Sequence, residues 1–128
     1  MSPVVKRWTY DDLLAMPEDN VIREIFDGEL FVSPSPFLRH QRIVGRLFLA
    51  ISKYLEEHPI GEAFVAPLDT VFSIDNVCEP DVLFVSHERS SILKKHVHGA
   101  PDFVIEVLSE LDAKNDRCAS WRSTSGLA

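Results

Sequence analysis

Residues 78–109, CEPDVLFVSHERSSILKKHVHGAPDFVIEVLS, contain two apolar runs around which the rest of the chain is organised. The first run is Pro80 to Val85 and the second is Asp102 to Leu108, with a polar connector between them. Apolar runs of this length are typical of strands that lie inside a sheet covered on both faces. We therefore expect two buried, neighbouring strands in this stretch.

Each run carries a carboxylate at a place where a buried strand would normally have an apolar side chain. Asp81 follows Pro80, and Glu106 stands between Ile105 and Val107. A buried carboxylate is costly unless it is paired, protonated or bound to a cation. Two such groups on neighbouring strands offer the oxygen ligands that a hard divalent cation prefers. The alternative is that Glu106 faces solvent and that Asp81 only begins its strand.

The composition is that of an ordinary globular domain. The chain has 128 residues, of which 45% are hydrophobic and 26% are charged, and this fits one domain with its own core. Its two cysteines, Cys78 and Cys118, are too few for a disulfide framework and lack zinc-site spacing, so a reducing, cytoplasmic setting is expected. No signal-peptide pattern and no apolar run of membrane-spanning length is present, so we expect no membrane partner.

The charge balance bears on the class of partner. The formal net charge is −7, which argues against a dedicated nucleic-acid-binding protein. It does not exclude a nuclease, because active-site carboxylates add negative charge and a bound divalent cation offsets that charge locally.

Residues 21–33, VIREIFDGELFVS, are typical of a β-hairpin. The dipeptide Asp27-Gly28 favours a tight turn, and the residues on either side of it alternate between apolar and polar. Glu24 falls on the same face as Ile22 and Phe26, so a carboxylate is again placed among apolar side chains. The alternative is a solvated strand glutamate that pairs with a basic residue across the hairpin.

Two helices are expected on either side of this hairpin, a short one over residues 8–16 and a long one over residues 37–57. Thr9 is a suitable N-cap for the first, and the second repeats apolar residues at helical spacing. The first half of the long helix carries a basic group: Arg39, His40, Arg42 and Arg46. This group either contacts a phosphate backbone or forms an ordinary solvated face. Further strands are expected over residues 62–66 and 70–74, and a short helix or loop over residues 87–95.

Taken together, these motifs resemble one family. They are REIFDGEL (23–30), SPSP (33–36) with a following histidine, EPDVLFV (79–85) and APDFVIEVLS (100–109). Their order is similar to that of the Uma-type restriction-endonuclease-like family, which belongs to the PD-(D/E)XK nuclease superfamily. The resemblance implies an α/β (α+β) fold with a restriction-endonuclease-like core, in which helices flank a mixed central sheet. We accordingly expect one domain over residues 1–117 and an irregular tail over residues 118–128.

The same resemblance implies a DNA endonuclease that depends on Mg²⁺, with Mn²⁺ as a further suitable ion. It makes Asp81 and Glu106 the metal ligands and Glu24 a further catalytic acid at the same cleft. His40 and Asp69 match recurring family positions and are accessory candidates. The chemistry is phosphodiester hydrolysis, in which the metal polarises a phosphoryl oxygen and activates a bound water. A lysine normally assists by stabilising the developing charge.

The chain departs from the superfamily pattern at that lysine. Val107-Leu108 follow Glu106, so the lysine of an ExK motif is missing. In the family the lysine stands after a DR pair, which Asp116-Arg117 matches, and its expected position near Ser120 falls in the tail. Lys114 is the nearest lysine and is kept as an accessory candidate. The later helix and strands of the family do not follow, so we interpret the chain as truncated or frameshifted, with an exposed sheet edge that favours a homodimer.

Two other interpretations of the function stay open. One is a non-catalytic remnant of a nuclease fold that binds nucleic acid or itself, which the missing lysine and the acidic charge favour. The retained Glu24, Asp81 and Glu106 favour the nuclease. The other is a small-molecule hydrolase that uses a His40–Asp69 dyad, although no serine or cysteine stands in a recognisable nucleophile turn.

Overall fold

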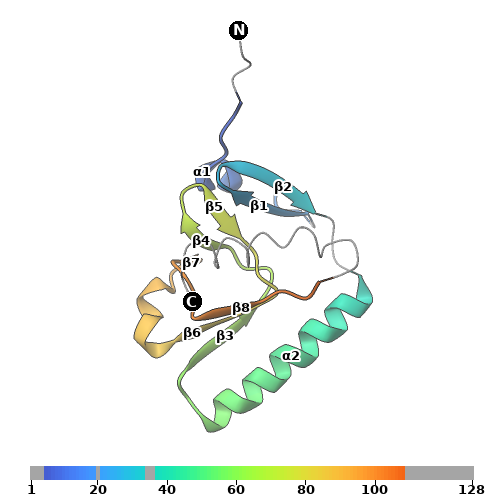
Figure 1. Ribbon diagram of the computed structural model, residues 1–128, viewed down its shortest axis with the longest axis vertical. Helices are drawn as coiled ribbons and strands as arrows, with labels where there is room; N and C mark the ends of the chain where they lie inside the picture. The colour runs from blue at the N-terminus through green and yellow to red at the C-terminus, as the bar shows by residue number, and fades with distance from the viewer. Residues whose placement is uncertain (1–4, 20, 34–36, 109–128) are drawn as a thin grey trace.

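The computed structural model describes residues 5–19, 21–33 and 37–108, which form two β-sheets and one long helix (Figure 1). The elements are, in chain order, α1 (Tyr10–Leu14), β1 (Ile22–Phe26), β2 (Glu29–Ser33), α2 (Leu38–Glu57), β3 (Gly61–Val65), β4 (Thr70–Ser73), β5 (Asn76–Cys78), β6 (Val82–Ser86), the 3₁₀ helix η1 (His87–Ile92), β7 (Val97–His98) and β8 (Phe103–Ile105). The expected tail over residues 118–128 lies outside the described residues. None of the described helices has the length and apolar composition of a membrane span.

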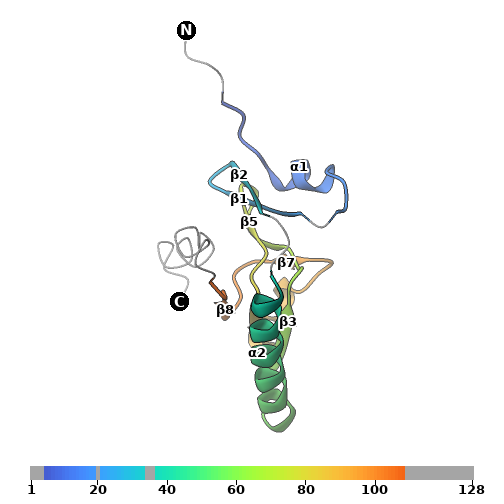
Figure 2. The same cartoon turned by 90° about the vertical axis from the view of Figure 1, so that its right-hand side faces the viewer.

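The strands are divided between two sheets. One has the order β2-β1-β5-β4-β7 and the other has the order β3-β6-β8. In the larger sheet β4 and β7 are parallel while the other pairs are antiparallel, so this sheet is mixed. Figure 1 shows the larger sheet above the smaller one, with α2 running beside β3, and Figure 2 shows α2 stacked against β3 from the side. The expected mixed α/β (α+β) architecture is confirmed.

The predicted hairpin is present with the predicted turn. Strand β1 pairs with β2 along its whole length, and the φ angles of Asp27 (51°) and Gly28 (78°) are both positive. A type I′ turn requires a positive φ at two consecutive residues. Glu24 lies opposite Phe31, and β2 contains no basic residue. The alternative in which Glu24 pairs with a basic residue across the hairpin is therefore wrong.

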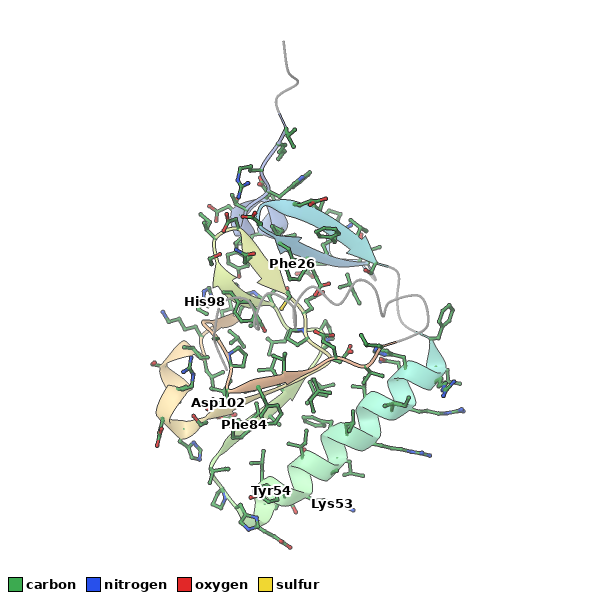
Figure 3. All side chains as sticks on the ribbon, viewed as in Figure 1. Phe26, Lys53, Tyr54, Phe84, His98 and Asp102 are labelled. Atoms are coloured by element: carbon green, nitrogen blue, oxygen red, sulfur yellow. The ribbon has the colours of Figure 1, made fainter. Side chains whose placement is uncertain are left out.

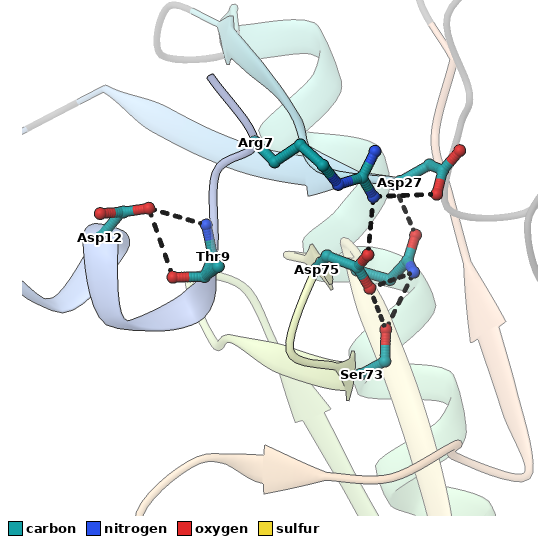
Figure 4. Close-up of polar contacts among 7 residues, drawn as sticks. Arg7, Thr9, Asp12, Asp27, Ser73 and Asp75 are labelled. Carbon is teal, nitrogen blue, oxygen red and sulfur yellow. Dashed lines mark hydrogen bonds and ion pairs between the residues drawn. The ribbon is translucent and has the colours of Figure 1, made fainter. Parts of the chain in front are cut away.

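Arg7 fixes the hairpin turn to the turn between β4 and β5 (Figure 4). Its Nη2 lies 3.3 Å from Asp27 Oδ1 and 2.9 Å from Asp75 Oδ2. The backbone N–H of Asp27 donates to Asn76 Oδ1 at 2.8 Å. The two turns are thus joined through side chains as well as through the β1–β5 strand pair.

Both predicted helices are present. Thr9 is the N-cap of α1, and its N–H and its hydroxyl donate to Asp12 Oδ2 at 2.9 and 3.3 Å (Figure 4). Helix α2 begins after Phe37, turns Val44 into the protein and packs against β3 and β6. The predicted polar connector forms η1, whereas the two short strands β5 and β7 were not predicted.

The two apolar runs form adjacent strands, as predicted, but they differ in burial. Strand β6 lies between β3 and β8, and its residues Val82 to Val85 are all buried. Strand β8 stands at the end of the described strand order, and Phe103 is 37% exposed, so the expectation of a second fully covered strand is wrong. The ladder ends at Ile105, because the N–H of Val107 donates to the side chain of Asp81 instead of to a neighbouring strand.

Two glycines allow a matched test of this packing. An added Cβ at Gly45, in the middle of α2, meets no atom within 4 Å, whereas at Gly61 in β3 it lies 2.7 Å from Phe84 Cζ and contacts the carbonyl of Val85. Gly45→Ala should raise the free energy of unfolding by about 0.5–1 kcal/mol, because alanine is the better helix former. Gly61→Ala should lower it by about 1–3 kcal/mol through overpacking. Urea denaturation measures both, and a change of the same sign in the two variants would contradict the packing described.

Candidate functional site

Asp81 connects three elements. It stands immediately before β6, and its Oδ2 accepts hydrogen bonds from the backbone N–H of Val107 at 2.7 Å and from His40 Nε2 at 3.2 Å. Val107 follows β8 and His40 lies in the first turn of α2. The side chains of Asp81 and His40 are only 16% and 14% exposed. The carboxylate is therefore held in one orientation, as a preorganised ligand or catalytic group requires.

Glu106 lies one residue beyond β8, close to Asp81. The β6–β8 register ends at the pair Val82 and Ile105, and Asp81 and Glu106 are the next residues of the two segments. The N–H of Val107, the residue after Glu106, donates to Asp81 Oδ2. The Oε1 atom of Glu106 is buried. Glu106 thus lies in a segment that is held next to Asp81 through the neighbouring Val107.

A second group of carboxyls gathers around Glu79. Its backbone N–H donates to Glu24 Oε2 at 2.9 Å, which fixes the Glu24 side chain of β1 against the segment after β5. Burial raises the pKa of Glu79 to about 8, and the negative charge of Asp69, a hydrogen bond with Asp69 and the charge of Glu24 add to this effect. Glu79 is therefore protonated at neutral pH, beside two other carboxyls.

Glu79 is the site residue that sequence reasoning missed. The sequence places Glu79 in the same acid-Pro-acid triplet as Asp81, separated from it only by the fully buried Pro80. Nothing in the triplet indicated that the first acid would be more buried than an ordinary loop residue. Its environment comes from Glu24 and Asp69, which are distant in the sequence.

Two cavities adjoin the two clusters of carboxyl side chains, the one at Asp81 and the one around Glu79. Each has a volume of about 420 Å³, and Glu79 lines both of them. Asp69 lines the first, together with Arg23 and Lys95. Asp81 lines the second, which we call the Asp81 cavity, and its other walls include Gln41 and Val44 of α2, Val65 of β3, and Val21 and Pro67.

The structure divides the predicted site residues between these two groups. His40 and Asp81 belong to one, with Glu106 in the segment that Val107 joins to Asp81, while Glu24 and Asp69 belong to the other. The His40–Asp69 dyad of the small-molecule-hydrolase interpretation is not formed, because His40 hydrogen-bonds Asp81. Lys114 lies outside the described residues. Within residues 5–19, 21–33 and 37–108, no three His, Cys, Asp or Glu side chains are grouped as ligands of one metal ion.

The residues at Asp81 nevertheless suit a divalent cation. Both hydrogen bonds to the Asp81 carboxylate reach Oδ2, and in the described part of the chain none reaches Oδ1. Glu106 supplies a second carboxylate from the adjoining segment. Mg²⁺ is commonly bound through one or two carboxylates, with waters and substrate phosphates as its other ligands, so two acids suffice.

The comparisons with known proteins agree with the fold. Residues 10–123 match the model of the family described as "Uma2: Putative restriction endonuclease". Among solved structures, the chain is similar to "a putative nuclease belonging to DUF820 from Anabaena variabilis ATCC 29413", with a TM-score of 0.68 and 22% sequence identity. The similarity covers 93% of this chain and 66% of that chain, and at this identity it shows the fold alone. The chain matches none of the curated proteins.

Glu79 predicts a pH dependence of stability. Its pKa is about 8 in the folded chain and near the ordinary 4.5 when unfolded, so between these values the folded state binds the extra proton. Stability should therefore fall as the pH rises from about 4.5 to about 8.

Glu79→Gln cannot ionise. It should change the free energy of unfolding little at about pH 5 and raise it by on the order of 1 kcal/mol at about pH 8, the full shift being reduced because solvent screens a half-buried carboxyl. Urea denaturation at both pH values tests this, and an equal effect at both would contradict it.

Proposed function

Because the chain belongs to the Uma2 family, whose description is that of a restriction endonuclease, we propose that it is a metal-dependent endonuclease that hydrolyses DNA phosphodiester bonds. The observation that supports the proposal is the hydrogen bond from the Val107 N–H to Asp81, which holds the segment that carries Glu106 next to Asp81. Mg²⁺ is the expected ion and Mn²⁺ is a further suitable one, because both are bound by carboxylate oxygens.

In the proposed reaction the oxygen of a water molecule bonds to phosphorus and loses a proton to solvent, while one phosphorus–oxygen ester bond breaks and the departing oxygen takes up a proton to become a hydroxyl. The divalent cation supplies charge stabilisation at the phosphoryl oxygens and lowers the pKa of a bound water. Asp81, which lines the Asp81 cavity, and Glu106 would hold the cation. The N–H of Val107 and the ring of His40 keep Asp81 in a single orientation, so little reorganisation is needed when substrate binds.

Glu24 has a positioning role in this proposal. Its carboxylate accepts the N–H of Glu79, and only Pro80 separates Glu79 from Asp81. The Glu24 side chain therefore fixes the backbone that enters the catalytic strand. Asp69 acts on the same segment through its interaction with the Glu79 carboxyl.

The non-catalytic remnant is the second candidate. The residues that follow Glu106 in the described chain are Val107 and Leu108, so the assisting lysine of an ExK motif is absent there. Self-association as a homodimer belongs to the same candidate, since β8 ends the described order of its sheet and Phe103 is partly exposed. Cleavage of DNA separates this candidate from the nuclease.

Plasmid nicking in the presence of Mg²⁺ or Mn²⁺ tests the proposal. The native chain should convert supercoiled DNA into open circles, and EDTA should stop the conversion. Asp81→Asn and Glu106→Gln should each lower the rate by about 100-fold or more, because a metal ligand contributes several kcal/mol to transition-state stabilisation.

Asp27→Asn is the matched control for these variants. Its side chain is 91% exposed in the hairpin turn, and asparagine tolerates the positive φ of this position. The control should nick DNA at the native rate. DNA binding without metal-dependent nicking by the native chain would instead establish the non-catalytic remnant.

A further inference from the structure

Helix α2 has a charge that differs from that of the rest of the chain. From Leu38 to Leu55 it contains four basic residues of the Lys and Arg type and no Asp or Glu, although the formal net charge of the whole chain is −7. The four are Arg39, Arg42, Arg46 and Lys53, and all of them are exposed. A local positive surface on an acidic protein indicates an anionic partner for that surface.

These four residues form one stripe, which we call the α2 basic stripe. Their spacings of three, four and seven residues keep them on a single side of the helix, within an arc of about 60° at 100° per residue. The buried Val44 lies on the opposite side, where α2 packs against the sheet. In Figure 3, Lys53 and other long side chains with nitrogen tips extend from the side of α2 that faces away from the strands.

The stripe has no structural explanation within the described part of the chain. None of its four residues forms a hydrogen bond or an ion pair there. Arg39 and Arg42 stand in the N-terminal half of the helix, where positive charge opposes the helix dipole. Like charges at spacings of three and four residues also repel one another. The arrangement therefore lowers the intrinsic stability of α2, and an external anion would offset this effect.

The stripe has the dimensions of a nucleic-acid backbone contact. At a rise of about 1.5 Å per residue, Arg39 and Lys53 are separated by about 21 Å along the helix axis. One strand of a duplex places about six phosphates in that length, at 3.4 Å each. Arginine and lysine side chains on a rigid helix bind phosphates without reading the base sequence.

We infer that the α2 basic stripe binds the phosphate backbone of the nucleic acid. The same first turn of α2 that presents Arg39 outward places His40 against Asp81, and Gln41 lines the cavity wall. The stripe and the cavity thus lie on different sides of α2, since Val44 also lines the cavity, and the stripe is a backbone contact separate from the cavity. This inference extends the proposed function by assigning the surface that holds the substrate, and it applies equally to a chain that binds DNA without cleaving it.

The salt dependence of DNA binding tests the stripe. Affinity for a fluorescein-labelled duplex is measured by anisotropy in EDTA, which prevents metal-dependent cleavage, at salt concentrations from about 50 to about 200 mM. For the double variant Arg42→Gln/Arg46→Gln, the slope of log K against log salt should be shallower by about 2 than the native slope. Over this range the native affinity should accordingly fall about 10-fold more than that of the variant.

Lys94→Gln/Lys95→Gln is the matched control. It makes the same change in net charge at two exposed lysines between η1 and β7, far along the chain from α2. Its slope should equal the native one. An unchanged slope in the α2 variant, an equal change in both double variants, or the absence of native binding would each overturn the inference. Failure of the nicking experiment with an intact slope difference would overturn only the nuclease proposal.

Discussion

The hydrogen bond from the Val107 N–H to the Asp81 carboxylate is the constraint on which the arrangement of β6, β8 and the start of α2 depends. It ends the β6–β8 ladder at Ile105, and it keeps the Glu106 segment beside Asp81. Because His40 donates to the same oxygen, the first turn of α2 is bound to this point as well. Because this mostly buried carboxylate accepts two hydrogen bonds, an acid is tolerated at the edge of the apolar core.

The carboxyl groups of Glu79 and Asp81, on either side of Pro80, lie in different environments. Asp81 Oδ2 accepts hydrogen bonds from the Val107 N–H and the His40 ring. Glu79 is surrounded by other acids and by apolar burial, which raises its pKa to about 8 and keeps it neutral. Because Glu79 is neutral, it adds no charge repulsion to the neighbouring carboxyl groups of Glu24 and Asp69.

Local patterns in the sequence were sufficient to predict most of the fold, and long-range contacts account for what they missed. The Asp27-Gly28 turn and the apolar periodicity of α2 are local, and both elements were correctly predicted. Strand β8 was predicted too long, because its end depends on the side chain of Asp81, which lies 26 residues from Val107. The sequence also indicated Asp81 and Glu106, but the role of Glu79 depends on partners from two other segments. The division of the strands into two sheets leaves no local pattern in the sequence.

The peptide Glu79-Pro80-Asp81 is also one of the covalent links between the two sheets, since β5 belongs to the larger and β6 to the smaller. Proline has a fixed φ, and this one is fully buried, so the link has little freedom to absorb a displacement. A relative shift of the sheets would therefore rotate the Asp81 carboxylate directly. Substrate that lies against both halves of the protein would act on the geometry of the proposed metal ligands through the backbone itself.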